Sequence, residues 1–334
     1  MNTHIKEEPL AMPSRRLGPD HLVVSAIGLG CMGMTWGYGK ADRTESIATL
    51  HRALDLGVTL FDTADIYGPF LNEELVGEAL AGHREGVILA TKCGLQVPDA
   101  SVFHDDASKF SLTRNGNPEH ILKSCDESLR RLRTDYIDLY QLHRVDPQVP
   151  VEETVGALAS LVKAGKVRHI GLSECTLDEL SRAHQVHPIA TVQSELSLWT
   201  RDALLEILPF CRSNGIGFLP FAPLGRGFLT GQFHQASNFK KEDFRSLLPR
   251  FQPEALKANV LIVDAVKDLA KRKEATPAQI ALAWLLALGE NVVPIPGASK
   301  RNHLEENLGG ALVQLTKEEQ ASLNELPSPT GGRY

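Results

Sequence analysis

Short apolar runs alternate with amphipathic segments along almost the whole chain. Eight of the runs are short enough to be buried strands and are rich in β-branched or aromatic residues. They lie at residues 26–32, 58–62, 87–92, 136–143, 167–173, 189–193, 216–221 and 292–295. Eight strands alternating with helices, with no low-complexity linker between the two halves, predict a single (β/α)8 barrel of the TIM-barrel type. A doubly wound open sheet is the alternative, because both folds share the alternation, but the number of strands favours the barrel.

Helix-start signals stand between the predicted strands. Five residues are predicted to cap helices, and these are Asp42, Asn72, Asn117, Thr176 and Thr276. Asp42 and Thr176 each precede a glutamate by three residues, which is the spacing of a capping box, and Asn117 and Thr276 each precede a proline. The helix after Asn72 is predicted to end at residue 81. Further helices are predicted at 151–164, 201–213, 254–273, 302–308 and 317–323.

The remaining segments divide the chain into an arm, a barrel and a tail. We predict a flexible arm over residues 1–13, the barrel over 14–325 and a carboxyl-terminal tail over 326–334. Residues 15–24 predict a β-hairpin around a Gly-Pro-Asp turn. The long loop 93–116 shows no clear period and is expected to form a pocket wall, and a second long loop covers 222–253. For the tail the sequence allows two outcomes, contact with the barrel mouth or disorder.

The composition is that of an ordinary globular protein, with 43% hydrophobic and 23% charged residues among 334. This length suggests about two domains on average, but single (β/α)8 barrels of ~250 residues and more are common. A net charge of −6 gives no reason to expect a nucleic acid or an anionic membrane as partner. The five cysteines include no Cys-x-x-Cys pair, which predicts reduced thiols and no metal site. The first residues predict no signal peptide and no run could span a bilayer, so we expect a cytoplasmic protein.

Polar side chains stand where several of the predicted strands end. Asp62, Lys92 and His143 end three successive strands, and Tyr67 follows Asp62 by five residues. In a barrel of this kind the carboxyl ends of the strands meet at one mouth, where catalytic groups lie. Each residue alone has an ordinary explanation, such as a loop cap, a solvated lysine or a satisfied interior histidine. Taken together, the four predict an active site.

Reduction of a carbonyl group is the chemistry that these four side chains could perform. A hydride that reaches the carbonyl carbon leaves negative charge on the oxygen, so a proton donor must point there. We predict that Tyr67 supplies this proton and that the ammonium group of Lys92 eases its release by stabilising the phenolate. Asp62 would keep Lys92 charged and in place, and His143 would donate a hydrogen bond to the substrate oxygen.

Several long motifs make the chain resemble the aldo-keto reductases from Arg16 to about Asn307. They are GLGCMGM at 28–34, DTADIYG at 62–68, IDLYQLH at 137–143, GKVRHIGLS at 165–173, PLGRG at 223–227 and IPGASKR at 295–301. The resemblance implies the barrel fold, NADPH as the hydride donor, and Asp62, Tyr67, Lys92 and His143 as the catalytic tetrad.

The resemblance also implies a set of residues that contact the cofactor. Ser173 and Gln193 would bond the nicotinamide amide, and Phe221 would stack on its ring, while Glu174 stands where many relatives have asparagine. The pyrophosphate loop would consist of Pro223, Leu224, Gly225, Arg226 and Gly227. Gly297 follows the last strand, and Ser299, Lys300 and Arg301 form a cationic cluster at a helix start, which fits the 2′-phosphate of NADPH. Glu306 and Asn307 match the adenine contacts. The ordinary alternatives are a glycine-rich turn and a solvated basic helix cap.

The glycines of residues 28–33 also match the pattern Gly-x-Gly-x-x-Gly of dinucleotide-binding folds. We reject this interpretation because a loop follows them, where the pattern requires a helix. Gly33 and Met34 are instead expected to lie beside the nicotinamide, where glycine lets the backbone turn closely.

The identity of the substrate is open at this stage. Trp36, Phe70, Phe228 and the loop 93–116 are candidates for the substrate wall, and each could equally be ordinary packing. An apolar wall indicates a small aldehyde or ketone with aromatic or aliphatic groups, and a narrower task, such as reduction of pyridoxal or of a sugar aldehyde, is also open. The alternative from another class is an NADPH-binding regulatory subunit resembling the potassium-channel β subunits. The sequence predicts no oligomeric state.

Overall fold

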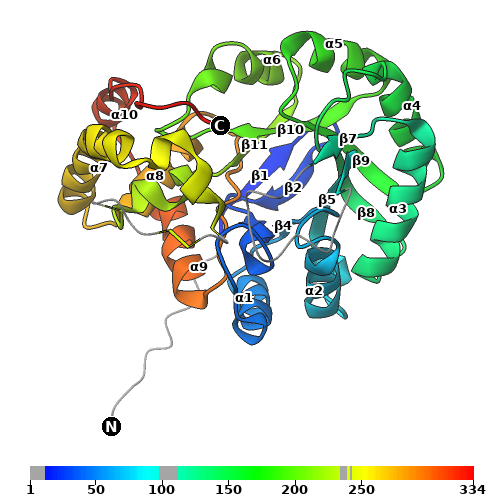
Figure 1. Ribbon diagram of the computed structural model, residues 1–334, viewed down its shortest axis with the longest axis horizontal. Helices are drawn as coiled ribbons and strands as arrows, with labels where there is room; N and C mark the ends of the chain where they lie inside the picture. Colours follow the sequence, from blue (N-terminus) through cyan, green and yellow to red (C-terminus); the bar gives the residue numbers. More distant parts are fainter. Residues whose placement is uncertain (1–11, 98–111, 234–238, 241–242) are drawn as a thin grey trace.

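A parallel sheet of seven strands forms most of a closed barrel in the computed structural model, which describes residues 12–97, 112–233, 239–240 and 243–334 (Figure 1). In spatial order, the strands are β11 (Gly217–Phe221), β10 (Ile189–Glu195), β9 (Val167–Ser173), β8 (Ile137–Leu142), β5 (Ile88–Cys93), β4 (Leu60–Asp62) and β3 (Leu29–Gly30). Most residues of these strands are apolar or β-branched and buried, as expected of a parallel sheet that is covered on both faces. The predicted arm begins outside the described residues, and the division into arm, barrel and tail stays a prediction.

Residues 292–297 close the barrel between β11 and β3. Parallel bridges join Phe218 to Val292 and Gly30 to Gly297. The carbonyl groups of Pro294 and Pro296 accept hydrogen bonds from residues 28 and 30, but neither proline has an N–H to return. This segment therefore forms bridges where the other seven form full ladders. A side chain at Gly30 would place its Cβ 2.9 Å from the carbonyl oxygen of Ile295, so only glycine allows this closure. The predicted (β/α)8 barrel is confirmed.

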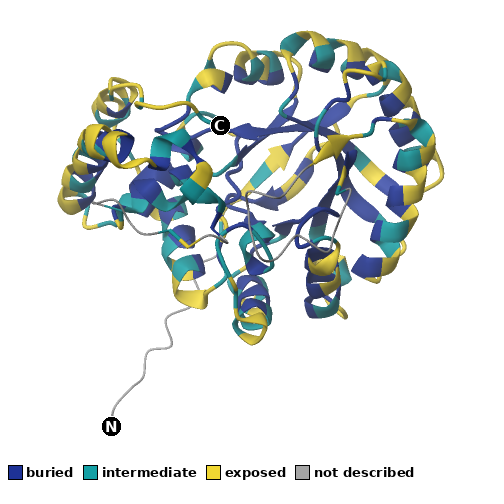
Figure 2. Ribbon diagram, in the orientation of Figure 1, coloured by how far each residue is buried: buried dark blue, intermediate teal, exposed yellow. Residues whose placement is uncertain are grey.

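Helices surround the strands, with their buried faces toward the barrel and their exposed faces outward (Figure 2). They are α1 (Arg43–Asp55), α2 (Leu71–Ala79), α3 (Pro118–Leu132), α4 (Val151–Lys163), α5 (Leu177–Val186), α6 (Ile207–Ser213), α7 (Pro253–Arg272), α8 (Pro277–Ala287), α9 (Arg301–Leu308) and α10 (Lys317–Asn324). The capping predictions for Asp42, Asn117, Thr176 and Thr276 are confirmed, since each side chain accepts a hydrogen bond from a backbone N–H of the first turn.

The prediction that Asn72 caps a helix is wrong. The helix α2 begins at Leu71, and the residue before it, Phe70, has a left-handed backbone and provides no side-chain cap. Asn72 is fully buried, and its amide group accepts a hydrogen bond from Thr63 and donates one to the carbonyl group of Cys31. Its polar side chain thus ties two loops at the carboxyl end of the strands, a task that local sequence spacing does not reveal.

The predicted hairpin is confirmed and closes the amino-terminal end of the barrel. It consists of β1 (Ser14–Leu17) and β2 (Leu22–Ser25), which pair in antiparallel register. Leu17, Leu22 and Val24 pack into one cluster with side chains from the barrel strands, among them Leu139 and Leu219. Burial of these apolar groups covers this end of the barrel, so polar chemistry is confined to the opposite end.

Two connections at the carboxyl end contain short elements that the sequence did not predict. The loop 93–116 carries a small antiparallel pair, β6 (Leu95–Gln96) with β7 (Thr113–Arg114), and its residues 98–111 lie outside the described part. Within 222–253 the chain forms the 3-10 helices η6 (Gly225–Thr230), η7 (Phe244–Leu247) and η8 (Pro249–Phe251). After α10 the chain returns to the barrel and ends beside β10 and β11 (Figure 1). Of the two outcomes open for the tail, contact with the barrel mouth is therefore correct.

Candidate active site

Lys92 lies at the centre of a polar cluster inside the carboxyl end of the barrel. It is the second-last residue of β5, and its side chain is fully buried. The ammonium group donates to Asp62 Oδ1 at 2.6 Å, to the carbonyl oxygen of Thr63 at 2.8 Å and to the hydroxyl oxygen of Tyr67 at 3.2 Å. Burial alone would lower the pKa of Lys92, but Asp62 and Tyr67 raise it, and the pKa lies above its ordinary value. The ammonium group is therefore charged.

Two glutamine side chains hold the second oxygen of the Asp62 carboxylate. Gln193 donates to Oδ2 at 2.8 Å and Gln141 donates to the same atom at 3.2 Å. The sequence analysis missed Gln141 and gave Gln193 a different role. A signal for Gln141 exists, because it precedes His143 by two residues, and such residues lie on the same face of a strand. With Lys92 and both glutamines, the buried carboxylate has the partners that its burial requires.

The phenol of Tyr67 borders this cluster from the loop after β4. Its ring lies 5.8 Å from the His143 ring in an edge-on arrangement and 5.9 Å from the ring of Trp36. Burial raises the pKa of the Tyr67 hydroxyl, and Asp62 adds to this, whereas Lys92 lowers it; the pKa lies above its ordinary value. The predicted effect of Lys92 is present, but burial outweighs it. The phenol consequently keeps its proton at neutral pH.

His143 follows β8 and is also buried. Burial lowers the pKa of its imidazole well below 6.5, and the positive charges of Lys92 and Arg144 act in the same direction. The ring is therefore neutral near pH 7 and carries one N–H that can donate. Its Nδ1 atom is buried and has no hydrogen-bond partner among the described residues. A buried polar atom without a partner is uncommon and marks a place where a ligand can bind.

The residues predicted to hold the nicotinamide lie at the ends of three neighbouring strands. Ser173 ends β9, and its hydroxyl oxygen accepts a hydrogen bond from Arg144 at 3.1 Å. Phe221 ends β11 and packs on the apolar cluster inside the barrel. Glu174, which has a left-handed backbone, accepts from the backbone N–H of Glu195 at 2.8 Å. Glu195 ends β10, and the sequence analysis missed it, although it follows Gln193 by two residues on the same strand.

The predicted pyrophosphate loop is an irregular 3-10 segment with left-handed backbone at Gly225, Arg226 and Gly227. A Cβ at residue 225 would lie 2.6 Å from the Trp199 ring, so this position needs glycine for space as well as for conformation. The guanidinium group of Arg226 donates to Glu195 at 2.8 Å and is almost fully buried. This arginine is engaged within the protein instead of facing solvent.

The residues predicted to bind the adenosine part lie just before α9 and along it, from Ser299 to Asn307. Lys300 precedes the helix, and Arg301 begins it. Arg301 is exposed, and its guanidinium group donates to both carboxylate oxygens of Glu45 on α1, at 3.2 and 3.1 Å. Ser299 and Glu306 are half-buried, and Asn307 is buried. The role of this basic group stays a prediction, and the Glu45 carboxylate already pairs with Arg301.

The three aromatic candidates for the substrate wall differ in their surroundings. The Trp36 ring lies next to Tyr67, as described above, which suits a substrate wall. The Phe70 ring packs on the guanidinium group of Arg131 from α3, at 4.6 Å, and stays 44% exposed. Phe228 is fully buried and stacks on Trp199 at 4.2 Å, which is ordinary packing.

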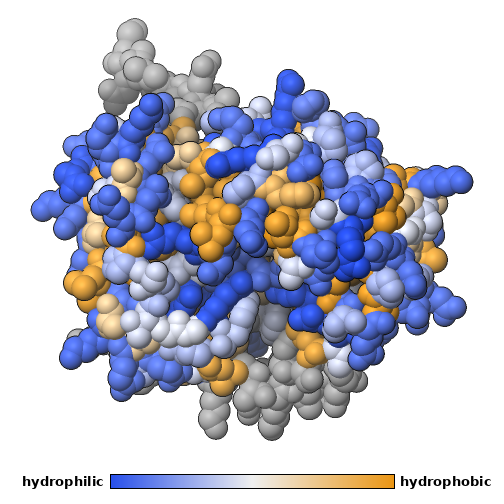
Figure 3. Space-filling model, turned by 90° about the horizontal axis from the view of Figure 1, so that it is seen from above, coloured by the Kyte–Doolittle hydropathy of each residue, from blue (hydrophilic) through white to orange (hydrophobic). Residues whose placement is uncertain are grey.

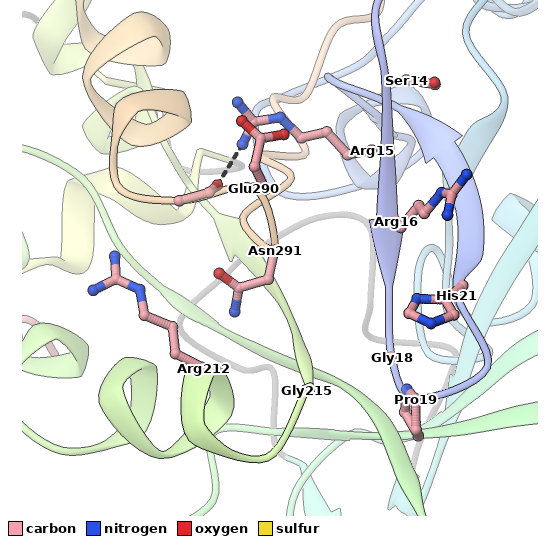
Figure 4. Close-up of a pocket in the computed structure, with 11 residues that line it drawn as sticks. Ser14, Arg15, Arg16, Gly18, Pro19, His21, Arg212, Gly215, Glu290 and Asn291 are labelled. Carbon is pink, nitrogen blue, oxygen red and sulfur yellow. Dashed lines mark hydrogen bonds between the residues drawn. The ribbon is translucent and has the colours of Figure 1, made fainter.

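A cavity of about 670 Å³ lies away from this site, beside the hairpin at the opposite end of the barrel (Figure 4). Arg15 reaches across it and donates to the carbonyl oxygens of Leu286, Gly289 and Val292 at 2.6 to 2.9 Å. Arg212 on the other wall bonds the carbonyl oxygen of Leu288. Both arginines satisfy carbonyl groups in the last turn of α8 or just after it, which gives them a structural role.

Known proteins resemble this chain over nearly its whole length. A model of the aldo/keto reductase family matches residues 26–327. A probable aldo-keto reductase of Glycine max is 44% identical over 327 residues, which cover 96% of this chain and 91% of the relative. A glycerol dehydrogenase from Gluconobacter oxydans has a TM-score of 0.83 and 32% identity, with 95% of each chain covered. An aldo-keto reductase from Klebsiella pneumoniae, solved in complex with NADPH, has a TM-score of 0.72 and 28% identity, with 97% of this chain and 99% of that chain covered.

Proposed function

The chain belongs to the aldo/keto reductase family, and from this premise we propose that it reduces aldehydes or ketones to alcohols with NADPH as hydride donor. The observation that supports the proposal most is the buried cluster in which Lys92 contacts both Asp62 and the Tyr67 hydroxyl, next to His143. Burial of a charged lysine lowers the stability of the fold unless the charge is paired, and ionisable groups in such surroundings are concentrated at functional sites.

The residues present fit NADPH as the cofactor. Ser173, Gln193 and Phe221 would hold the nicotinamide end, with Gly33 and Met34 beside it. Residues 223–227 would line the middle, and Gly297 with the basic group at the start of α9 would hold the 2′-phosphate. Glu306 and Asn307 would contact the adenine. The unpartnered Nδ1 atom of His143 supports a ligand at this mouth. When bound, NADPH supplies the hydride that the carbonyl carbon receives. The Klebsiella pneumoniae relative, solved with NADPH, supports this choice.

Four side chains would manage the charge that develops on the carbonyl oxygen. Tyr67 holds a proton at neutral pH and donates it from its hydroxyl group to that oxygen. The ammonium group of Lys92, 3.2 Å from the same hydroxyl, stabilises the phenolate that remains. Asp62 keeps Lys92 charged despite its burial. The neutral imidazole of His143 donates a hydrogen bond to the carbonyl oxygen and so orients the substrate.

Substrate selection would depend on the wall around this cluster. Trp36 adjoins the Tyr67 ring and presents an aromatic surface to the reacting group. Phe70 remains a weaker candidate, since its ring packs against Arg131. A small carbonyl compound with an aromatic or aliphatic substituent fits such a wall.

A panel of aldehydes and ketones tests the proposal, with loss of NADPH absorbance as the readout. We expect steady NADPH consumption with at least one reactive aromatic or aliphatic carbonyl compound. The control is Tyr67→Phe, which keeps the ring and removes the proton donor, and which should lower kcat by about 10²- to 10⁴-fold. Retained turnover in this variant would refute the role given to Tyr67.

The same panel separates the enzyme from a regulatory NADPH-binding subunit. Tight binding of NADPH without turnover on any member of the panel would favour the regulatory subunit. The face seen in Figure 3 is mostly hydrophilic, and its hydrophobic residues form small separate groups. Among the described residues we find no feature that favours a regulatory partner over a small substrate.

A further inference from the structure

The last residues of the chain are bound to the barrel by specific hydrogen bonds. Asn259 of α7 is buried, and its amide group donates to the carbonyl oxygen of Thr330 at 3.0 Å and accepts from the N–H of Thr330 at 2.7 Å. Arg250 in η8 donates to the carbonyl oxygen of Gly331 at 3.2 Å. These bonds direct the final two residues into the barrel mouth, where the chain ends in Figure 1.

Arg333 lies among the residues that the proposed function assigns to the nicotinamide. Its Nε atom donates to Glu195 at 2.8 Å, and its Nη2 atom forms an ion pair with Glu174 at 2.7 Å. The guanidinium carbon lies 5.6 Å from the centre of the Phe221 ring. Both carboxylates are largely buried, with exposed side-chain fractions of 16% for Glu174 and 4% for Glu195. The ion pairs are thus only weakly screened by solvent.

Tyr334 extends this contact to the predicted pyrophosphate loop. Its hydroxyl oxygen accepts a hydrogen bond from Arg226 at 3.1 Å, and its ring lies 5.4 Å from the Arg226 guanidinium carbon and 5.0 Å from that of Arg333. Arg226 is also paired with Glu195. The two arginines and the two glutamates balance one another in charge, and Tyr334 packs against both arginines. The dipeptide therefore links the strand ends to the loop.

Phe221 packs against the cluster inside the barrel and is half-buried, so only its exposed part is left for a planar ligand. Arg333 is positioned near that ring, and a guanidinium group and a nicotinamide cannot share one aromatic face. Arg226 in turn cannot reach a pyrophosphate while it stays bound to Glu195 and Tyr334. We propose that Arg333 and Tyr334 occupy the nicotinamide end of the cofactor site and compete with NADPH, so that the tail must leave before the cofactor binds. This inference depends on the proposed function.

Competition by the tail has a simple quantitative consequence. If only one molecule in ten has an undocked tail, the apparent affinity for NADPH is reduced about tenfold. The tail acts before binding, so its loss should raise the association rate and leave the dissociation rate unchanged. Undocking also leaves Glu174 without its ion-pair partner Arg333, which favours the docked state.

Two variants release the tail without changing the residues around the nicotinamide end. Asn259→Ala removes both bonds to Thr330 and retains Glu174, Glu195, Phe221 and Arg226. A chain that ends at Pro329 removes the competing residues outright. The matched control is Asn214→Ala. It loses one exposed hydrogen bond, from the side chain of Asn214 to the carbonyl oxygen of Phe210 at the end of α6. Binding of NADPH is followed by its fluorescence, at equilibrium and in stopped flow, and urea unfolding confirms that each variant is folded.

We expect both release variants to bind NADPH about five- to tenfold more tightly through faster association, and Asn214→Ala to match the unchanged protein. In the unchanged protein, amide hydrogen exchange of residues 327–334 should rise when NADPH is added. Equal or weaker binding by the release variants, or exchange that falls on NADPH addition, would overturn the competition and make the tail part of the bound site. If the unchanged protein and all variants fail to bind NADPH, the proposed function itself is wrong, and the competition is overturned with it.

Discussion

Replacement of Lys92 by methionine tests how strongly the buried Asp62 carboxylate depends on its ion pair with Lys92. Methionine keeps most of the volume of the side chain and removes its charge. The Asp62 carboxylate would then retain only its hydrogen bonds from Gln141 and Gln193, at 3.2 and 2.8 Å. Lys92 and Asp62 are 0% and 4% exposed in their side chains, so water cannot replace the lost partner.

The expected magnitude follows from this burial. Removal of one partner from a buried ion pair leaves an uncompensated charge, which costs about 3–5 kcal/mol of unfolding free energy. We therefore expect Lys92→Met to lose this amount at neutral pH. When Asp62→Asn is combined with it, the buried charge disappears, and about 1–3 kcal/mol should be recovered relative to the single variant. The recovery is incomplete because the new amide group still needs partners.

Urea unfolding of the three proteins measures these differences. The control is Lys166→Met, because Lys166 pairs with Asp126 on the surface, where the two side chains are 40% and 58% exposed. Surface pairs contribute little, so this control should unfold close to the original protein. The reasoning is refuted if Lys92→Met is as stable as Lys166→Met, or if the double variant is no more stable than Lys92→Met alone.

Three further predictions concern the cofactor and pH. Arg301→Ala should weaken NADPH binding about tenfold or more and change NADH binding little, because it removes the proposed charged contact to the 2′-phosphate. Equal losses in a titration of both cofactors would contradict this. The pKa of His143 is lowered well below 6.5 in the folded protein. As the pH falls below 6.5, the unfolded chain therefore binds a proton at this residue that the folded chain does not. The free energy of unfolding then falls by up to ~1.4 kcal/mol per pH unit. His143→Asn should lessen this acid loss in urea unfolding series, and an unchanged slope would count against it. Asp62→Asn removes the carboxylate that offsets the burial of Lys92, so the alkaline limb of the kcat/KM profile should move to lower pH; an unmoved limb would show that Asp62 does not maintain the charge.

The sequence predicts the barrel and the four central residues because both depend on local signals. Strand runs and capping residues are set within a few positions of the chain, and the polar residues at strand ends follow from the fold. Asp62 is the last residue of β4 and Lys92 the second-last residue of the neighbouring β5, so their contact could be expected once the order of strands was known. The wrong prediction for Asn72 shows the limit of such local signals. In the sequence Asn72 looks like a helix cap, whereas in the structure its buried side chain connects two loops.

Interactions across the barrel could not be predicted in the same way. The bond from Gln193 to Asp62 joins residues 131 positions apart, and the pair of Arg333 with Glu195 joins residues 138 positions apart. Neither has a spacing signal, because their proximity exists only once the barrel has closed. The pKa of Tyr67 could not be predicted from the sequence either. Lys92 could be expected to lower the pKa of the phenol, but the opposing burial depends on the packed structure.

The raised pKa of Tyr67 separates two tasks that the tetrad could perform. A group that donates a proton at neutral pH must first hold it, and burial together with the Asp62 charge ensures that Tyr67 does. In the proposed mechanism, easing of proton release then depends on Lys92, and the charge of Lys92 in turn depends on Asp62. Asp62 therefore opposes proton release directly, by its charge near the phenol, and supports it indirectly, by keeping the ammonium group protonated. The indirect effect must be the larger if the proposed mechanism is correct, because Lys92 is the cation that contacts the Tyr67 hydroxyl in the described part of the chain.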